Sequence, residues 1–224
     1  MTGHFIVIDG PDGAGKGTQI DMLKGVLPHR YGRPDSDFVF TREPGGSPFA
    51  EKIRELILSP GAKEASGAVM VQLFGAARFE HLEQTVVPAL DAGKVVVSDR
   101  FDASTYAYQL IAQKGGRVAG TLFHRQNELV RDMGCFFGRG WATIVLDVPA
   151  EIGMARSAKR RGQAHTHFDS RDTAFHELVR DGYKRYAHQF LGVSVIDASR
   201  TPCLVHHDVI AVFDRILGGP SPLT

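Results

Sequence analysis

The residues Gly10-Pro11-Asp12-Gly13-Ala14-Gly15-Lys16-Gly17-Thr18 follow almost directly on the apolar run Phe5-Ile6-Val7-Ile8. An apolar strand, a glycine-rich turn and a lysine that opens a helix occur in this order in phosphate-binding loops. Glycines let several backbone N–H groups point into one concavity, and the helix N-terminus adds a partial positive charge. The stretch therefore predicts a polyphosphate site, in which Lys16 supplies a full charge to the outer phosphates.

The residue after the lysine departs from the strict pattern. A serine or threonine usually stands there and binds magnesium through its hydroxyl, whereas this chain has Gly17, with Thr18 one position later. We therefore expect that hydroxyl ligand to be displaced or absent. The alternative is an ordinary glycine-rich turn, but the glycines, the lysine, the preceding strand and the following helix all favour the phosphate loop.

The composition limits the class of protein. The 224 residues suffice for one sizeable core, and no linker divides them, so we expect a single domain over residues 1–224. A net charge of +1 gives no basic field to attract nucleic acid. The two cysteines have no repeated spacing, which favours a reduced cytosolic setting and buried side chains. No apolar run approaches the ~20 residues that span a bilayer and no cleavable signal begins the chain, so we expect a cytoplasmic protein without membrane contact.

Short apolar runs recur along the chain, separated by segments long enough for helices. They are Phe5 to Ile8, Phe38 to Phe40, Val95 to Val97, Ile144 to Leu146 and Val193 to Ile196. Such runs are typical of strands covered on both faces, and their alternation with helices predicts a parallel sheet. The expected fold is an α/β, three-layer sandwich with a five-stranded parallel sheet flanked by helices.

The segments between these runs carry helix signals. We expect helices over Thr18 to Leu27 ending at Pro28, from the Ser47-Pro48 cap onward, over Ala68 to Leu90 with a kink or end near Pro88, and over Val209 to Leu217 before Gly218. A basic helix, Glu151 to Gly162, leads into the polar loop His165-Thr166-His167. A cationic insert with a loop at its tip, about residues 151–170, predicts a closing lid. A solvated helix face is the alternative for the basic cluster.

Two further strand ends carry polar side chains, and ligands of open parallel sheets bind at those ends. One is followed by Thr41-Arg42-Glu43-Pro44-Gly45-Gly46 and the other by Ser98-Asp99-Arg100-Phe101. Asp99 is well placed to hold magnesium through water, and the planar fork of Arg100 suits a second phosphate. The alternative is that Asp99 and Arg100 only pair with each other.

These motifs resemble the thymidylate kinases, in the nucleoside monophosphate kinase group. The phosphate loop, Thr41 to Gly46, Phe74-Gly75-Ala76-Ala77-Arg78, and Asp99-Arg100-Phe101 with Ser104-Thr105-Tyr106-Ala107-Tyr108-Gln109 occur in the family's order between about residues 5 and 190. The resemblance implies transfer of the γ-phosphoryl group of ATP to dTMP, with Mg²⁺, in a homodimer. Catalysis would rest on positioning and charge neutralisation, without a nucleophilic side chain.

The resemblance also implies roles for individual residues. Phe74 would stack on the pyrimidine, Arg78 would reach a base carbonyl, and Thr105 and Gln109 would complete the hydrogen-bonding edge around thymine. The simpler alternative for Phe74 is a core aromatic side chain. The remaining substrate residues would be Tyr108 under the sugar, Asp12 at the 3′-hydroxyl, Arg54 and Arg100 on the acceptor phosphate, and Glu43 in the magnesium and water network.

The lid differs from the family pattern. Family members with glycine at the position of Gly13 lack an arginine there, and arginines of the lid would compensate for it. Arg160 and Arg161 are our preferred lid pair. The other catalytic residues would be Lys16, Asp99 and Arg100. The family's usual Asp-Arg-hydrophobic-Glu stretch is absent, and His165 to Asp169 lie around that place. Two other functions stay open at this point: a broader deoxynucleoside monophosphate kinase, and a nucleotide sensor without turnover on the same fold.

Overall fold

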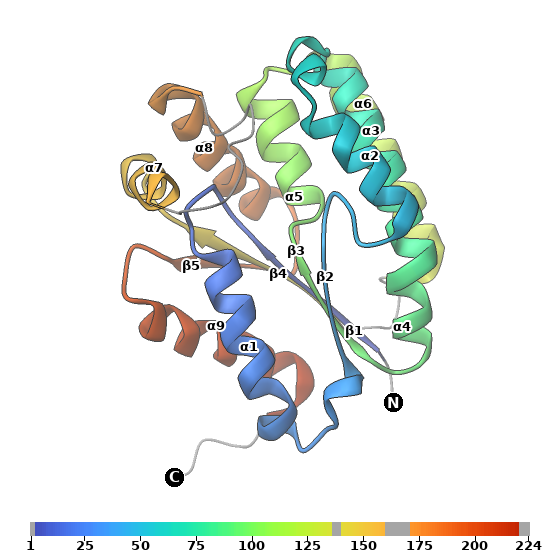
Figure 1. Ribbon diagram of the computed structural model, residues 1–224, viewed down its shortest axis with the longest axis vertical. Helices are drawn as coiled ribbons and strands as arrows, with labels where there is room; N and C mark the ends of the chain where they lie inside the picture. The colour runs from blue at the N-terminus through green and yellow to red at the C-terminus, as the bar shows by residue number, and fades with distance from the viewer. Residues whose placement is uncertain (1–2, 136–139, 160–170, 220–224) are drawn as a thin grey trace.

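Five parallel strands form one sheet in the order β2-β3-β1-β4-β5 (Figure 1). The structure is a computed structural model that describes residues 3–135, 140–159 and 171–219. The strands are β1 (His4–Asp9), β2 (Phe38–Arg42), β3 (Val95–Asp99), β4 (Gly140–Asp147) and β5 (Val193–Asp197). Each contains one of the predicted apolar runs. The predicted α/β class, with a five-stranded parallel sheet between helices, is confirmed.

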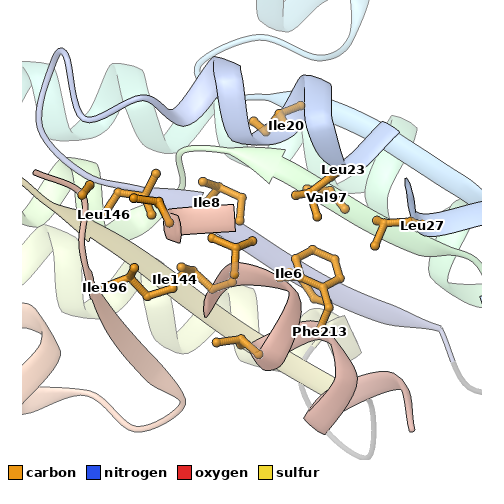
Figure 2. Packing of buried hydrophobic residues seen from close by; sticks show 14 of the residues in the cluster. Ile6, Ile8, Ile20, Leu23, Leu27, Val97, Ile144, Leu146, Ile196 and Phe213 are labelled. Atoms are coloured by element: carbon orange, nitrogen blue, oxygen red, sulfur yellow. The ribbon is translucent and has the colours of Figure 1, made fainter. Parts of the chain in front are cut away.

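One face of the sheet is covered by α1 (Lys16–Tyr31) and α9 (Pro202–Leu217). Figure 2 shows Leu23 and Leu27 of α1 and Phe213 of α9 packed against Ile6 of the central strand, all fully buried. Burial of each such side chain contributes ~1.5–3 kcal/mol relative to leaving it in water. The packing holds the start of α1, and therefore the phosphate loop, against the central strand.

The other face carries helices from the middle and the later part of the chain (Figure 1). They are α2 (Pro48–Leu58), α3 (Gly67–His81), α4 (Val87–Asp91), α5 (Asp102–Thr105), α6 (Gly116–Val130) and α8 (Thr173–Gln189). The helix α7 (Ala150–Ala158) packs against α8. Short 3₁₀ segments lie at Asp35–Asp37 and Pro60–Glu64, and π-helical segments at Leu82–Val86, Tyr106–Ala112 and Arg131–Cys135. The helices α3 and α8 bring side chains from distant parts of the chain to the carboxyl ends of β1, β2 and β3.

Several helix boundaries differ from the prediction. α1 begins at Lys16 and continues through Pro28 to Tyr31. Pro28 removes only one intrahelical N–H, and the turn around it closes at Gly32, whose left-handed conformation lets its N–H donate to the carbonyl of His29. α9 begins at Pro202, seven residues before Val209, because proline is well suited to the first turn of a helix. The Ser47 cap of α2 is confirmed by its Oγ, which accepts from the N–H of Ala50 at 3.4 Å.

The segment predicted as one helix from Ala68 to Leu90 is divided. α3 ends at His81, a π-helical turn follows over Leu82–Val86, and α4 continues to Asp91. A π-helical turn shifts the angular position of the residues that follow it, and such turns are frequent at functional sites. The second π-helical segment, Tyr106–Ala112, carries Tyr108, predicted to lie under the sugar, and Gln109, predicted to lie beside the base.

Two other findings concern the surface. Cys203 is exposed, so the prediction of a buried side chain is wrong there; it lies in the first turn of α9. Within residues 3–135, 140–159 and 171–219, no helix has the length and apolar character needed to cross a membrane.

Candidate active site

The glycine-rich loop runs from the end of β1 to the start of α1 and requires glycine at its tightest point. Gly13 has a φ of 75°, and a Cβ atom there would lie 1.9 Å from the carbonyl oxygen of Gly153. In return, a Cβ on Gly153 would lie 2.6 Å from the carbonyl oxygen of Asp12. The loop and α7 therefore pack backbone against backbone, a contact that the sequence did not indicate.

Lys16 lies inside this loop. Its Nζ donates to the carbonyl oxygens of Gly10 at 2.8 Å and Pro11 at 2.9 Å, and the residue is only 8% exposed. These two hydrogen bonds hold the ammonium group inside the loop, so the side chain does not face solvent. Burial, and then the charge of Arg100, lowers the pKa of Lys16 to about 8, against the attraction of Asp12.

Arg100 follows β3 and points across the end of β1. Its φ is 73°, in the left-handed region that non-glycine residues rarely adopt. Nη2 donates to Asp12 Oδ1 at 2.5 Å, while Nη1 donates to Ser104 Oγ at 2.9 Å and to Tyr183 Oη at 3.2 Å. The guanidinium is thus held at the mouth of the phosphate loop, with its side chain 21% exposed.

Asp9, the last residue of β1, organises these contacts and was missed in the sequence analysis. It is fully buried, and its two carboxylate oxygens accept from the backbone N–H groups of Gly10, Phe101 and Ser104 at 2.9–3.1 Å. Its Oδ1 also accepts from the hydroxyls of Ser104 and Tyr183, each at 2.7 Å. The strand-end rule that selected Asp99 could have found Asp9, but no local signal indicated Tyr183, which lies on α8.

Asp12 joins the loop to the next helix. Its Oδ2 accepts from the hydroxyl of Tyr108 at 2.7 Å, and its Oδ1 binds Arg100. Burial would raise the pKa of Asp12, but the charges of Arg100 and Lys16 and the hydrogen bond from Tyr108 lower it to about 2. Asp12 is therefore an ionised acceptor at every working pH, as the predicted contact with a sugar hydroxyl requires.

Asp99 and Arg54 lie beside the loop. Asp99 Oδ1 is buried and has no hydrogen-bond partner among the described residues, although burial of a carboxylate oxygen normally demands one. Asp99 lines an open groove of about 460 Å³ together with Gly17 and Thr41. Arg54 of α2 donates to the carbonyl oxygen of Pro44 at 2.8 Å. Asp99 and Arg100 do not form an ion pair within the described part of the chain, so the alternative of simple mutual pairing is not supported.

A second polar cluster lies between α3 and the π-helical segment after α5. Arg78, 1% exposed, donates from Nη2 to Thr105 Oγ1 at 3.0 Å, while its Nη1 has no partner among the described residues. Gln109 is 1% exposed, and neither its Oε1 nor its Nε2 has a partner in that part of the chain. Phe74 is half-buried one turn before Arg78. The structure thus brings together the four side chains predicted around the base.

Glu43 pairs with two side chains of α3. Its Oε2 accepts from Arg78 Nε at 2.8 Å, and its Oε1 lies 3.1 Å from His81 Nδ1. The residue is 4% exposed. Both carboxylate oxygens therefore contact α3, and a role of Glu43 in the magnesium and water network stays a prediction.

A buried carboxyl group stands behind this cluster. Asp102 accepts from the hydroxyl of Tyr186 at 2.9 Å and from Asn127 Nδ2 at 3.1 Å. Burial raises the pKa of Asp102 to about 6, although the charge of Arg78 opposes that rise. Among the described residues, no three His, Cys, Asp or Glu side chains are arranged to hold a metal ion by themselves.

The predicted lid is described only in its first helix. α7 spans Ala150–Ala158, and Arg156 donates to the carbonyl oxygens of Ala198 at 2.7 Å and Ser199 at 3.0 Å. Arg156 is therefore engaged at the edge of the sheet. The preferred catalytic pair, Arg160 and Arg161, and the loop His165 to His167 lie outside the described residues.

The comparisons with known proteins agree with one another. The family model described as thymidylate kinase matches residues 8–209. A thymidylate kinase from Pediococcus pentosaceus is 39% identical over 221 residues, covering 97% of this chain and 100% of that protein. One from Pseudomonas putida is 39% identical, covering 97% and 98%. A crystal structure of thymidylate kinase from Ehrlichia chaffeensis superposes with a TM-score of 0.70 at 30% identity, covering 95% of this chain and 99% of that one.

Proposed function

The chain belongs to the thymidylate kinase family, and we propose from this that it transfers the γ-phosphoryl group of ATP to dTMP, giving dTDP and ADP. An oxygen of the acceptor phosphate attacks the γ-phosphorus while the bond from that phosphorus to the ADP oxygen breaks. The reaction needs no covalent enzyme intermediate, so the chain's contribution is to position both nucleotides and neutralise their charge.

One observation carries the proposal for the acceptor. Arg78 Nη1 and both amide atoms of Gln109 are buried and have no partner among the described residues. Burying a donor or acceptor without a partner costs ~1–3 kcal/mol, so such a group indicates a ligand or water. A carboxamide offers one acceptor and two donors, which match the imide N–H and carbonyl groups of thymine. The phosphate loop at the other end of the site supports ATP as the donor.

The residues between these two ends are proposed to hold the reacting groups. Lys16 and the loop N–H groups bind the donor phosphates, and Arg100 with Arg54 binds the acceptor phosphate. Asp12 accepts from the 3′-hydroxyl, and Tyr108 lies under the sugar. The fixed network around Asp9 supports this arrangement, because it holds Arg100 before any substrate binds.

Magnesium is proposed to bind near Asp99, mainly through water and the phosphates of ATP. The buried Asp99 Oδ1 suits this role, since magnesium keeps much of its hydration shell and prefers carboxylate oxygen. A Cβ atom on Gly17 would meet no atom within 4 Å, so the position has room for a water where related loops have a hydroxyl. When bound, magnesium neutralises phosphate charge.

Gly17→Ser should therefore strengthen magnesium binding. The added hydroxyl would supply the missing ligand, and a gain of ~1 kcal/mol would lower the Mg²⁺ concentration for half-maximal ATP binding about 5-fold. Gly25→Ser is the matched control, because Gly25 lies on the same helix, with open space around its Cβ, away from the loop. Fluorescent ATP titrated at several Mg²⁺ concentrations measures the effect; an equal response of the two variants would contradict it.

We also propose a cytoplasmic location and a lid over about residues 151–170.

We further propose that the chain forms a homodimer. α2 and α3 pack together, as do α3 and α6, and they carry several exposed apolar side chains. These are Phe49, Leu56, Val69, Val118 and Leu129. Burial of these apolar side chains against a second copy would stabilise a dimer. Sedimentation velocity should give the mass of two chains, and a monomer at micromolar concentration would contradict the assignment.

The decisive experiment is a panel of nucleoside monophosphates incubated with the purified chain, ATP and Mg²⁺. We expect ADP formation with dTMP at a higher kcat/KM than with dUMP, dCMP or dGMP. Comparable values across the panel would favour a broader deoxynucleoside monophosphate kinase. Binding of ATP and dTMP without ADP formation would instead indicate a nucleotide sensor.

A further inference from the structure

His81, the last residue of α3, takes no part in the mechanism above, yet it is fully buried between two polar partners. Its Nε2 lies 2.8 Å from the hydroxyl of Thr41 at the end of β2, and its Nδ1 lies 3.1 Å from Glu43 Oε1. Each ring nitrogen therefore has one defined partner. The imidazole links the loop after β2 to the helix that carries the base-binding residues.

The proton positions follow from the partners. An ionised Glu43 can only accept, so His81 Nδ1 carries a proton and donates it. The hydroxyl of Thr41 can pair with Nε2 either as donor or as acceptor, so this contact suits either form of the ring. His81 thus holds one oxygen of Glu43, while the other oxygen accepts from Arg78 Nε at 2.8 Å.

The orientation of Arg78 is set by these contacts. Nε binds Glu43, Nη2 binds Thr105, and the guanidinium carbon lies 4.7 Å from the centre of the Phe101 ring. Because the guanidinium is planar, fixing two of its nitrogens fixes the direction of the third. That third nitrogen, Nη1, is the buried atom without a partner in the described chain.

We infer that His81 is a positioning residue for recognition of the base: it orients Glu43, and Glu43 holds Arg78 so that Nη1 donates to a pyrimidine carbonyl. The inference rests on the proposed function, since it takes dTMP as the ligand of Arg78. It adds a residue that touches neither substrate. A purely structural role is the competing explanation, because a Cβ on Gly46 would also meet His81, at 2.5 Å.

Two substitutions distinguish the contribution of Nδ1, which contacts Glu43, from that of Nε2, which contacts Thr41. The amide nitrogen of asparagine can occupy the place of Nδ1 and donate to Glu43, whereas the amide group of glutamine reaches the place of Nε2, where its nitrogen donates to the hydroxyl of Thr41 or its oxygen accepts from it. His81→Gln should therefore keep the contact with Thr41 and lose donation to Glu43, whereas His81→Asn should do the reverse. We expect His81→Gln to raise KM for dTMP ~10-fold, with KM for ATP unchanged and a smaller change in kcat. His81→Asn should restore most of the dTMP affinity.

The outcomes distinguish the explanations. A structural role predicts that both variants lower Tm alike and change both KM values together, which would overturn the inference. An unchanged KM for dTMP in a folded His81→Gln variant would overturn it as well. If His81→Gln does not fold, Glu43→Gln tests the next contact in the chain, because it weakens the ion pair to Arg78 at nearly constant shape. An unchanged KM for dTMP in that variant would also overturn the inference. Failure of the wild-type chain to phosphorylate dTMP would reject the proposed function instead.

Discussion

Lys16→Met should lower kcat/KM for the phosphoryl transfer by ~10²–10³-fold. The lysine ammonium is the full positive charge inside the glycine-rich loop, 2.8 and 2.9 Å from two loop carbonyls, and removal of one preorganised charge from such a site costs ~3–4 kcal/mol. Steady-state kinetics with ATP and dTMP measure the loss. The variant should remain folded, because methionine fills a similar volume without a buried charge.

Lys94→Met is the control for this substitution. Lys94 directly precedes β3, at the end of the sheet opposite the glycine-rich loop, and is partly exposed. Surface substitutions of this kind change stability by about 0.5 kcal/mol or less, and activity should change less than about 3-fold. Near-normal turnover by a folded Lys16→Met variant would remove Lys16 from the mechanism.

The pH dependence of ATP binding gives a second measurement on the same residue. Burial lowers the pKa of Lys16 to about 8 before ATP binds, and the bound phosphates favour the protonated ammonium. Above that pH the lysine must take up a proton when ATP binds. The affinity for ATP should therefore fall as pH rises through about 8, and Lys16→Met should lose this dependence. Calorimetric titration at pH 7 and pH 9 tests it.

Arg100→Lys should lower kcat about 10²-fold although it keeps the charge. The guanidinium binds Asp12, Ser104 and Tyr183 at once, in a fork that an ammonium cannot reproduce. A lysine would also sit at a φ of 73° without those contacts to offset the strain. We expect KM for dTMP to rise together with the fall in kcat, because the proposed role is to hold the acceptor phosphate.

Arg30→Lys provides the corresponding control. Arg30 of α1 forms a two-point contact with Asp214 of α9 at 2.8 and 2.6 Å, on the face of the sheet away from the cluster around Arg78. The same chemical change should there leave kcat within about 2-fold and affect only stability. Equal losses in both variants would show that Arg100 acts through the fold rather than at the reacting phosphate.

Local sequence determined the main elements of the fold because the signals that define them are short-range. The five apolar runs became the five strands, and the Ser47-Pro48 pair capped α2 as predicted. The loop from Gly10 to Gly15 needed only its own glycines and the preceding strand. Helix ends were less predictable, since Pro28 lies inside α1 and Pro202 starts α9 earlier than its apolar pattern indicated.

The polar cluster around Arg78 was predicted only in part. The resemblance selected Arg78, Thr105 and Gln109; the structure joins Arg78 to Thr105 and buries Gln109 one turn after Thr105. It did not predict that Glu43 would turn toward His81 and Arg78, because those partners lie 35 or more residues away on a different element. Motif spacing along one helix carries no information on such contacts.

The sequence by itself determined that this chain has a phosphate loop, a parallel sheet and the motifs of the thymidylate kinase family. Tertiary structure alone decided that Asp9 holds Arg100 through Ser104 and Tyr183, residues 95 and 174 positions away from it. The physical reason is the strand order β2-β3-β1-β4-β5, which brings the carboxyl ends of β1, β2 and β3 together and packs α3 and α8 over them. Side chains meet there because of long-range pairing, and that pairing is not contained in any short segment of the chain.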